Sequence, residues 1–384
     1  MTVPAHAPQS AIQTAPIAGA SHPSSMKGAS APGASLSQAT LTTSRWMTIV
    51  GLLWCVAAVT ALVCLQFGAE RIGFGKILSL LLSGDSGVRT EERGGDVAAT
   101  ILLHVRLPRV LLGFLVGGCL AAVGVALQAL LRNPLADPYV LGVSSGAALG
   151  AAIGILFGVG ATFLAETALP ICGFVGGLAA LLVLYRMAVS YERLPIHSLL
   201  LAGVILNAIF SALVMFITSI LDPNRSYGMM AWLMGTLTAP TYGGLLVVAG
   251  YLLVGVGLLM RQAHTLNLLA LGEASAKSLG VDTERAKRHV FVLAALMTGA
   301  IVSVSGMIGF IGMVVPHAVR LVLGADHRLL LPASALVSGA FLMGADTVAR
   351  TLLAPAEIPV GIITALVGGP FFVYLLLWRK DRLA

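Results

Sequence analysis

Charged side chains are scarce in this chain. Asp, Glu, Lys and Arg make up 10% of its 384 residues, whereas hydrophobic residues make up 58%. Soluble domains carry roughly 25% charged residues, so this composition excludes an ordinary soluble protein and indicates a polytopic membrane protein. The mean hydropathy of +0.95 agrees with this. The net charge of +7 is small for this length, and in a membrane protein it is typical of basic cytoplasmic loops rather than of nucleic-acid binding.

Cysteine and the motifs of soluble catalysis are also poorly represented. Four cysteines lie in apolar runs without C-x-x-C spacing, so we interpret them as small buried hydrophobic residues: Cys55, Cys64, Cys119 and Cys172. The segment 73–76 reads GFGK and lacks the first glycine and the final Ser or Thr of a P-loop, and no H-E-x-x-H occurs. We therefore expect no enzyme and no cofactor or metal bound by this chain. Any nucleotide hydrolysis that drives it must come from another polypeptide.

Long apolar runs are what the sequence has in abundance. About 20 apolar residues of helix cross a bilayer, and ten candidate spans follow from residue 46 onward. They lie near 46–67, 107–131, 139–158, 169–189, 198–221, 241–260, 289–308, 310–323, 329–348 and 360–378. We expect an all-α membrane domain over 46–380. Residues 1–45, rich in Ala, Ser, Thr, Pro and Gly, predict a disordered cytoplasmic tail.

Glycine and proline mark two packing features. The seventh and eighth spans share a glycine-rich joint, and Pro316 is expected to interrupt the short eighth span. Non-helical backbone at membrane depth survives only inside protein or beside a cavity, so the joint indicates a multi-helix bundle. In the third span every fourth residue is glycine, which predicts close packing against another helix rather than a substrate site. These glycines are Gly142, Gly146, Gly150, Gly154 and Gly158.

The distribution of basic residues predicts the orientation. Loops on one side carry most of the lysines and arginines, which places that side in the cytoplasm together with both termini. The later loops on the other side hold only Arg225 and Arg350, although the first external loop, 68–106, is basic as well. The basic residues assigned to the cytoplasm are Arg132, Arg186, Arg193, Arg261, Lys277, Arg285, Lys287, Arg288, Arg328, Arg379, Lys380 and Arg382.

The largest internal hydrophilic segment, 261–289, lies between spans six and seven on the predicted cytoplasmic side. A short helix, a glycine turn and a second short helix over 273–279 fit its sequence, because Gly272 and Gly280 bracket the second helix. A solvated loop is one interpretation. The other is a protein contact, because the segment has an apolar side rimmed by charge. That side consists of Leu266, Leu268, Leu269, Leu271 and Leu279.

A few polar residues fall at the ends of spans or within them. Arg106, Arg109 and Arg350 lie at predicted external ends, where they could receive carboxylates of a docking partner or reach lipid headgroups. Gln128, Asn207, His317, Arg320 and Asp346 are the polar residues nearest the bilayer interior. Asp346 precedes Arg350 by four residues and is expected to pair with it. With at most one acidic residue at mid-membrane, coupling to an ion gradient is disfavoured.

Several motifs together resemble one family. They are RLPR at 106–109, QALLRNPLADPYVLGVSSGA at 128–147, LGEASAKSLGV at 271–281, GFIGMVVPHAVR at 309–320, the run from Asp326 to Pro332, ADTVAR at 345–350 and EIPVGIITALVGGPFF at 357–372. This combination resembles the FecCD-type permeases, the membrane subunits of ATP-binding-cassette (ABC) importers for iron–siderophores, haem and cobalamin. The resemblance covers about 46–380. The charged stretch 84–97 and the N-terminal tail depart from the family pattern.

The resemblance implies a type II importer permease of ten spans in the inner (plasma) membrane, working as a homodimer. It implies a substrate-binding protein outside, docked on Arg106, Arg109 and Arg350, and a cytoplasmic gate at Asn133 and Leu135. It also implies two cytoplasmic ATPase subunits that use ATP and Mg and hold coupling helices of the 261–289 loop. The coupling residues would be Leu271, Gly272, Glu273, Ala274, Ser275, Ala276, Lys277, Ser278, Leu279 and Gly280.

Two other functions stay open on the residues alone. An ion-coupled secondary transporter would need no ATPase and would move its substrate on a proton or sodium gradient. A membrane scaffold would transport nothing. The choice among iron–siderophore, haem and cobalamin does not follow from the sequence.

Overall fold

The computed structural model describes residues 42–68, 70–83, 97–159, 165–188 and 194–380. All regular secondary structure in these ranges is helical. The predicted tail lies outside them except for its last residues. Thr42 accepts a hydrogen bond from the Arg45 amide and caps a helix that begins at Thr43, so residues 43–45 are helical and the predicted boundary at 45 is wrong. Most of the charged stretch at 84–97 also lies outside the described residues.

Each of the ten predicted spans overlaps one apolar helix of the described structure. Among these residues, seven helices are long and apolar enough to cross a membrane, and three further apolar helices are shorter. The ten are α1 (Thr43–Gln66), α4 (Leu107–Leu130), α5 (Val143–Leu156), α6 (Ala165–Ala188), α7 (Ile196–Ile220), α9 (Tyr242–Arg261), α12 (Thr283–Ser305), α13 (Ile311–Leu323), α14 (His327–Thr351) and α15 (Val360–Lys380).

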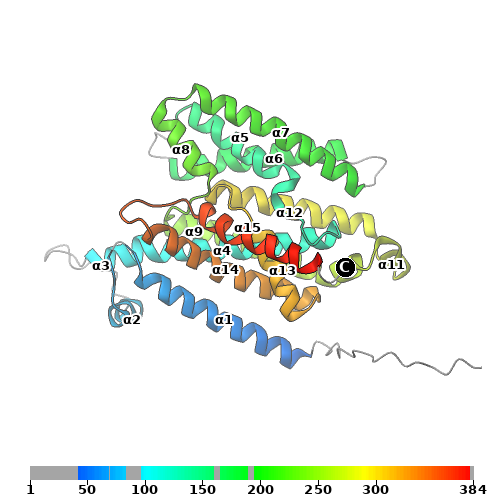
Figure 1. Cartoon of the computed structure of the whole chain (residues 1–384), viewed down its shortest axis with the longest axis horizontal. Helices are drawn as coiled ribbons and strands as arrows, with labels where there is room; N and C mark the ends of the chain where they lie inside the picture. Colours follow the sequence, from blue (N-terminus) through cyan, green and yellow to red (C-terminus); the bar gives the residue numbers. More distant parts are fainter. Residues whose placement is uncertain (1–41, 69, 84–96, 160–164, 189–193, 381–384) are drawn as a thin grey trace, which may run out of the picture. The chain divides into compact units, whose positions relative to one another are not determined.

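Shorter helices occupy the connections. They are α2 (Phe74–Ser83), α3 (Val97–Thr100), the π-helix η2 (Ile101–Arg106), the 3₁₀-helix η3 (Pro138–Leu141), α8 (Pro223–Leu233), α10 (Ala263–Ala270) and α11 (Glu273–Ser278). The α10–α11 connection and the segments that directly follow α4 and α13 lie at one end of the long helices, and we call this the α11 end. The opposite end, with α2, α3 and α8, is the α8 end (Figure 1).

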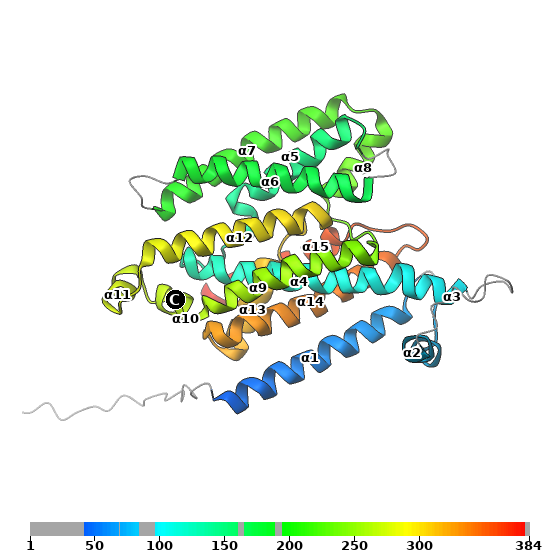
Figure 2. The same ribbon diagram turned by 180° about the vertical axis from the view of Figure 1, so that it is seen from behind.

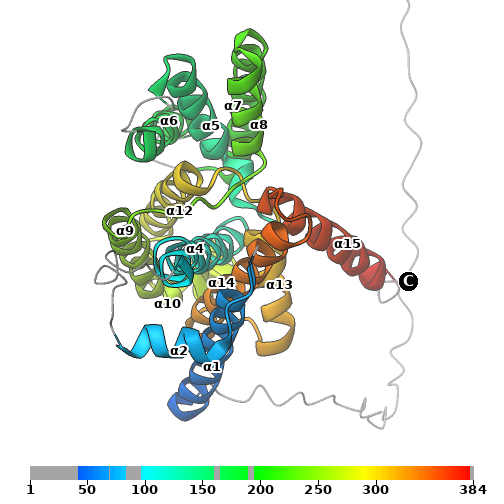
Figure 3. The ribbon, with the colours of Figure 1, turned by 90° about the vertical axis from the view of Figure 1, so that its left-hand side faces the viewer.

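Helix α4 is the centre of the packing. It contacts α14, α13, α12 and α9 (Figure 3), and its residues are almost all buried. Helices α5, α6 and α7 form a second group, and α12 lies between the two groups with contacts to both α4 and α6 (Figure 2). Because α4 and α12 are enclosed by other helices, they carry the core, while α1, α7 and α9 expose most of their apolar surface.

The glycine ladder packs as predicted, though over a shorter length. A Cβ atom on Gly150 would overlap the Cys172 carbonyl oxygen of α6, and Gly146 and Gly154 also face α6. The two outer glycines flank the helix instead of lying in it. Gly142 and Gly158 adopt φ angles of +74° and +79°, a region that residues with a Cβ rarely enter. Three glycines of the ladder, together with Gly176 of α6, therefore allow the close approach of α5 and α6.

The structure corrects three further expectations. Helix α12 begins at Thr283, six residues before the predicted 289, because Asp282 caps it by accepting the Arg285 amide at 3.1 Å. Helix α13 runs unbroken through Pro316. The joint before α13 is non-helical as predicted, with φ +64° at Gly306 and +69° at Phe310. Cys55 is exposed rather than buried, although all four cysteines are free.

Candidate functional site

The predicted helix–turn–helix of the 261–289 segment is present at the α11 end. Helix α10 follows α9, and Gly272, at φ +115°, turns the chain into α11; Gly280, at φ +83°, turns it out again. The apolar side predicted for this segment divides in two. Leu266 and Leu269 are buried against the body, whereas Leu271 and Leu279 are 67% and 61% exposed on either side of α11. The exposed leucines leave an apolar surface at the tip of the bundle.

A buried lysine joins α11 to α12. The Lys287 ammonium lies 2.7 Å from a Glu273 carboxylate oxygen and 2.8 Å from one of Glu284, and it donates to the Leu194 carbonyl at 3.3 Å. Glu273 is the first residue of α11, so its charge is also favoured by the partial positive charge of the helix N-terminus. The Glu273–Lys287 contact therefore connects α11 directly to the first turns of α12.

The same carboxylate faces the turn after α4. Arg132 lies 3.9 Å from Glu273 and has a positive φ of +48°. In the turn itself, the Asn133 carboxamide oxygen accepts the Leu135 amide at 2.9 Å, an Asx turn that fixes the local backbone. Leu135 is 39% exposed. The two predicted gate residues thus lie in one tight turn, next to the residue that Glu273 approaches.

A further contact joins this region to the α12–α13 joint. The Ile308 amide donates to the Tyr139 hydroxyl at 2.6 Å, and Asp137 caps η3 by accepting the Tyr139 amide at 2.8 Å. Burial raises the pKa of the Asp137 carboxyl, and the hydrogen bond from Tyr139 partly offsets this. The segment 131–141 is therefore connected to α11 at one end and to the non-helical joint at the other.

A second link at the α11 end was not predicted. The Asn267 side chain on α10 donates to Asp326 at 2.9 Å and accepts the His327 amide at 2.8 Å. Asp326 also accepts from the Arg328 guanidinium at 2.7 Å, and these bonds lower the pKa of its carboxyl to about 2. Asn267 and Asp326 are 59 positions apart in the sequence, so no local pattern could have indicated their contact. Helices α10 and α14 are held together by it.

The three predicted docking arginines converge at the α8 end, where they bind groups of this chain. Arg106, 3% exposed, donates to the carbonyls of Leu65 and Gln66 at 3.0 and 3.3 Å and to that of Glu70. Arg350, 7% exposed, donates to the Cys64 carbonyl at 2.9 Å. The last carbonyls of a helix lack intrahelical partners, so Arg106 and Arg350 satisfy those of α1.

Arg109 is the most accessible of the three charged groups. Its guanidinium binds both oxygens of the buried Asp346, with Nη2–Oδ1 at 2.9 Å and Nε–Oδ2 at 3.0 Å, and reaches Glu357 at 2.9 Å. The predicted Asp346–Arg350 pair is longer, at 3.7 Å. The side chain of Glu357 is 55% exposed. One side of the Arg109 guanidinium is therefore held inside the bundle by Asp346, and the other side contacts the Glu357 carboxylate at the surface.

Two polar residues predicted near the bilayer interior also pair with each other. Arg320 of α13 donates to the Gln128 side-chain oxygen at 3.1 Å, and Gln128 donates to the Met313 carbonyl at 3.2 Å. These bonds attach α13 to the last turn of α4. Within the described ranges, no three or more His, Cys, Asp or Glu residues form a group that could hold a metal ion.

The ten apolar helices of the described ranges, with a charged helix–turn–helix at one end, are those of a multi-pass membrane protein. The model of the FecCD transport family matches residues 55–378, and the chain belongs to that family. It is a membrane-spanning permease subunit of an ABC importer.

Named relatives agree with this assignment. The chain is 44% identical, over 75% of its length and 86% of the relative's, to the hemin transport system permease protein HmuU of Yersinia pestis. It is also 44% identical to the cobalamin import system permease protein BtuC of Halobacterium salinarum, over 75% of this chain and 76% of that one.

A solved structure supports the fold as well. It is described as an inward-facing conformation of a candidate metal-chelate type ABC transporter. The TM-score is 0.72 at 31% sequence identity, covering 86% of this chain and 99% of the other. The predicted all-α permease fold is thus confirmed.

Proposed function

We propose that this chain carries a bulky iron–siderophore, haem or cobalamin inward across the inner (plasma) membrane by alternating access. The named relatives transport hemin and cobalamin, and a further one, 37% identical, is the Fe(3+) dicitrate permease FecD of Escherichia coli. The observation that carries the mechanism is the buried Lys287, which binds Glu273 of α11 from within α12. It provides a rigid connection between a surface helix and the core.

We assign the α11 end to the cytoplasm, with both termini on that side, and to contact with two ATPase subunits that use ATP and Mg. Residues 271–280 form the contact, because Leu271 and Leu279 are exposed beside α11 while Leu266 and Leu269 anchor the unit to the bundle. Exposed apolar groups bordered by charge are typical of protein contacts. The chain itself supplies the membrane pathway and no hydrolytic chemistry.

Movement of α11 then reaches the gate by two routes. Glu273 acts on α12 through Lys287, and on the Asn133–Leu135 turn through Arg132. The Tyr139–Ile308 bond continues from that segment to the α12–α13 joint. ATP and the binding protein can bias such an element only by binding its two states unequally. ATP binding at the α11 end and substrate release from the binding protein at the α8 end would therefore determine which end of the pathway is open.

We place the docking of a substrate-binding protein at the α8 end, on Arg109. A glutamate of the partner would take the place of Glu357 on the outer face of the guanidinium, since Glu357 is largely solvent-exposed. Charge-assisted, bidentate pairs suit this exchange. Arg106 and Arg350 would act through position, by fixing the end of α1 beside Arg109.

A homodimer, with the pathway on its axis, completes the proposal. Helices α7 and α15 expose apolar side chains, among them Val204, Phe216, Leu366 and Val373. Helix α15 packs mainly against α13 and α14 and leaves the rest of its surface uncovered (Figure 3). Such faces suit a second copy or lipid.

Reconstitution tests the proposal directly. The chain is placed in proteoliposomes with its ATPase and binding protein, and uptake of haem, cobalamin and several ferric siderophores is compared. We expect one of these cargoes to accumulate with ATP and not with a hydrolysis-deficient ATPase. Accumulation driven by a proton or sodium gradient alone would contradict the proposal and favour a secondary transporter.

A further inference from the structure

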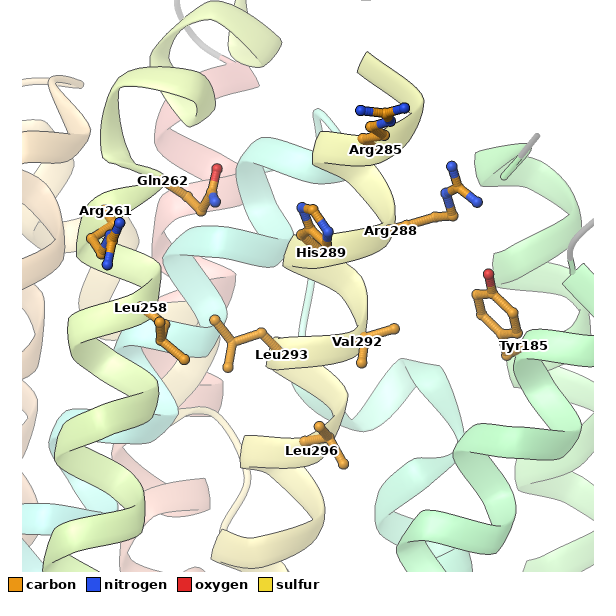
Figure 4. A pocket seen from close by; sticks show the side chains of 10 residues that line it. All are labelled: Tyr185, Leu258, Arg261, Gln262, Arg285, Arg288, His289, Val292, Leu293 and Leu296. Atoms are coloured by element: carbon orange, nitrogen blue, oxygen red, sulfur yellow. The ribbon is translucent and has the colours of Figure 1, made fainter. Parts of the chain in front are cut away.

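A groove at the α11 end lies apart from the coupling contacts. It encloses about 990 Å³ between the end of α9, the first turns of α12 and α6. Figure 4 shows its lining from α9 on one side to Tyr185 of α6 on the other, with α12 between them. The full lining is Tyr185, Leu258, Arg261, Gln262, Arg285, Arg288, His289, Val292, Leu293 and Leu296.

The lining is divided along the helix axes. Arginines and a histidine occupy the part nearest the end of the bundle, and leucine and valine side chains occupy the part further along α12 (Figure 4). From Arg288 to Leu296 the helix rises about 12 Å, at 1.5 Å per residue. The groove therefore offers a cationic rim followed by an apolar floor that extends along a spanning helix.

The charge of this rim is only partly compensated. Arg285 pairs with Asp282 at 3.0 Å. Among the residues that the structure describes, no ion pair reaches Arg261 or Arg288, whereas Lys287, on the other side of the same turn, binds two carboxylates. Two cations of the rim, Arg261 on α9 and Arg288 on the side of α12 toward α6, thus lack internal counter-ions from the described ranges.

We propose that this groove binds an anionic phospholipid, with its headgroup at the cationic rim that carries Arg261 and Arg288 and its acyl chains along Leu258, Leu293 and Leu296. A basic pocket between spanning helices at the cytoplasmic side suits a lipid headgroup, and guanidinium groups form strong bonds with phosphate. A soluble anion would use the rim but not the floor. The floor selects a lipid, because the groove opens beside α9, whose surface is mostly uncovered and apolar.

The site has a consequence for the transporter. Arg261 ends α9, immediately before α10, and Arg288 lies next to Lys287, which holds α11. A bound lipid would therefore brace the two helices that flank the coupling unit. The inference rests on the proposed cytoplasmic assignment of the α11 end but not on transport. Its test below measures lipid binding, so its failure and a failure of the transport proposal are distinguishable.

Native mass spectrometry of the full permease, delipidated and then titrated with phosphatidylglycerol or phosphatidylcholine, tests the site. We expect tight retention of phosphatidylglycerol by the wild type, and a roughly thirtyfold weaker retention in Arg261→Gln/Arg288→Gln, since each of the two basic groups contributes about 1 kcal/mol near the surface. Arg186→Gln is the matched control, being an exposed arginine of α6 at the same end that does not line the groove.

A second variant tests the apolar floor of the groove separately from the headgroup contacts. Leu293→Trp fills the apolar part without removing charge, and thermal unfolding verifies that it folds. We expect it to lose phosphatidylglycerol as well, and we expect sn-glycerol 3-phosphate at millimolar concentration not to displace the lipid from the wild type. Equal retention of the two lipids by the wild type, unchanged retention in the double variant, or full displacement by glycerol phosphate would each overturn the proposal.

Discussion

The Lys287 ammonium and the Glu273 carboxylate lie 2.7 Å apart, and this contact joins the surface helix α11 to the buried first turns of α12. A lysine with a 4% exposed side chain is stable as a cation only with such partners. The contact is therefore both a stability element and, in the proposed mechanism, the link between ATPase and membrane core.

A double-mutant cycle on this pair measures its strength. Glu273→Gln leaves Lys287 with Glu284, so we expect a loss of about 1 kcal/mol, because Glu273 is one-third exposed and its charge is screened. Lys287→Met leaves two carboxylates side by side and should cost about 3 kcal/mol. Thermal unfolding in detergent gives the coupling free energy. Additive effects of the two substitutions would contradict the contact.

The exposed leucines beside α11 should matter for assembly and not for folding. Leu271→Ser/Leu279→Ser removes two apolar groups from the proposed ATPase contact, and we expect the affinity for the ATPase to fall by about tenfold or more. Leu352→Ser, at a 62% exposed leucine of the α8 end, serves as the control and should bind normally. Pull-down titration measures both. Equal binding by all three proteins would remove α11 from the interface.

Glu357 and Arg109 give a test of docking in which affinity should rise. Glu357→Gln removes the surface carboxylate that occupies the outer face of Arg109 and leaves the Asp346 pair intact. A glutamate of the binding protein then no longer competes with Glu357 for Arg109. We therefore expect the substrate-binding protein to bind several-fold more tightly, which corresponds to about 1 kcal/mol of binding free energy. Surface plasmon resonance on nanodiscs measures it. Charge reversal, Arg109→Glu, should weaken binding. Unchanged affinity in both variants would contradict the docking role of Arg109.

Asp326 makes part of the stability pH-dependent. Its folded pKa, about 2, lies below the value of about 3.9 for a free Asp. The carboxylate therefore contributes stability that is fully present above pH 4 and is lost as the pH falls through 2. We expect Asp326→Asn to lower the melting temperature by a constant amount between pH 5 and 7. That difference should shrink as the pH approaches 2, and a difference independent of pH would contradict the assignment.

The spans and the two short helices of the 261–289 segment could be predicted because their signals are local. Apolar runs give the spans, and Gly272 and Gly280 bracket α11 in the sequence as they do in the structure. Helix ends were less predictable, since Asp282 starts α12 within a charged segment. The hydrogen-bond partners of Arg106 and Arg350 could not be predicted, because the carbonyls that these arginines bind belong to the end of α1, which is distant in sequence.

The most direct test of the account is the ratio of substrate uptake to ATP hydrolysis in proteoliposomes that carry Glu273→Gln, its ATPase and the binding protein. We predict that hydrolysis continues while uptake per ATP falls by about tenfold, the effect of losing a coupling free energy of about 1.4 kcal/mol. An unchanged ratio, in a variant that assembles and folds normally, would contradict the claim that α11 drives the gate through Lys287.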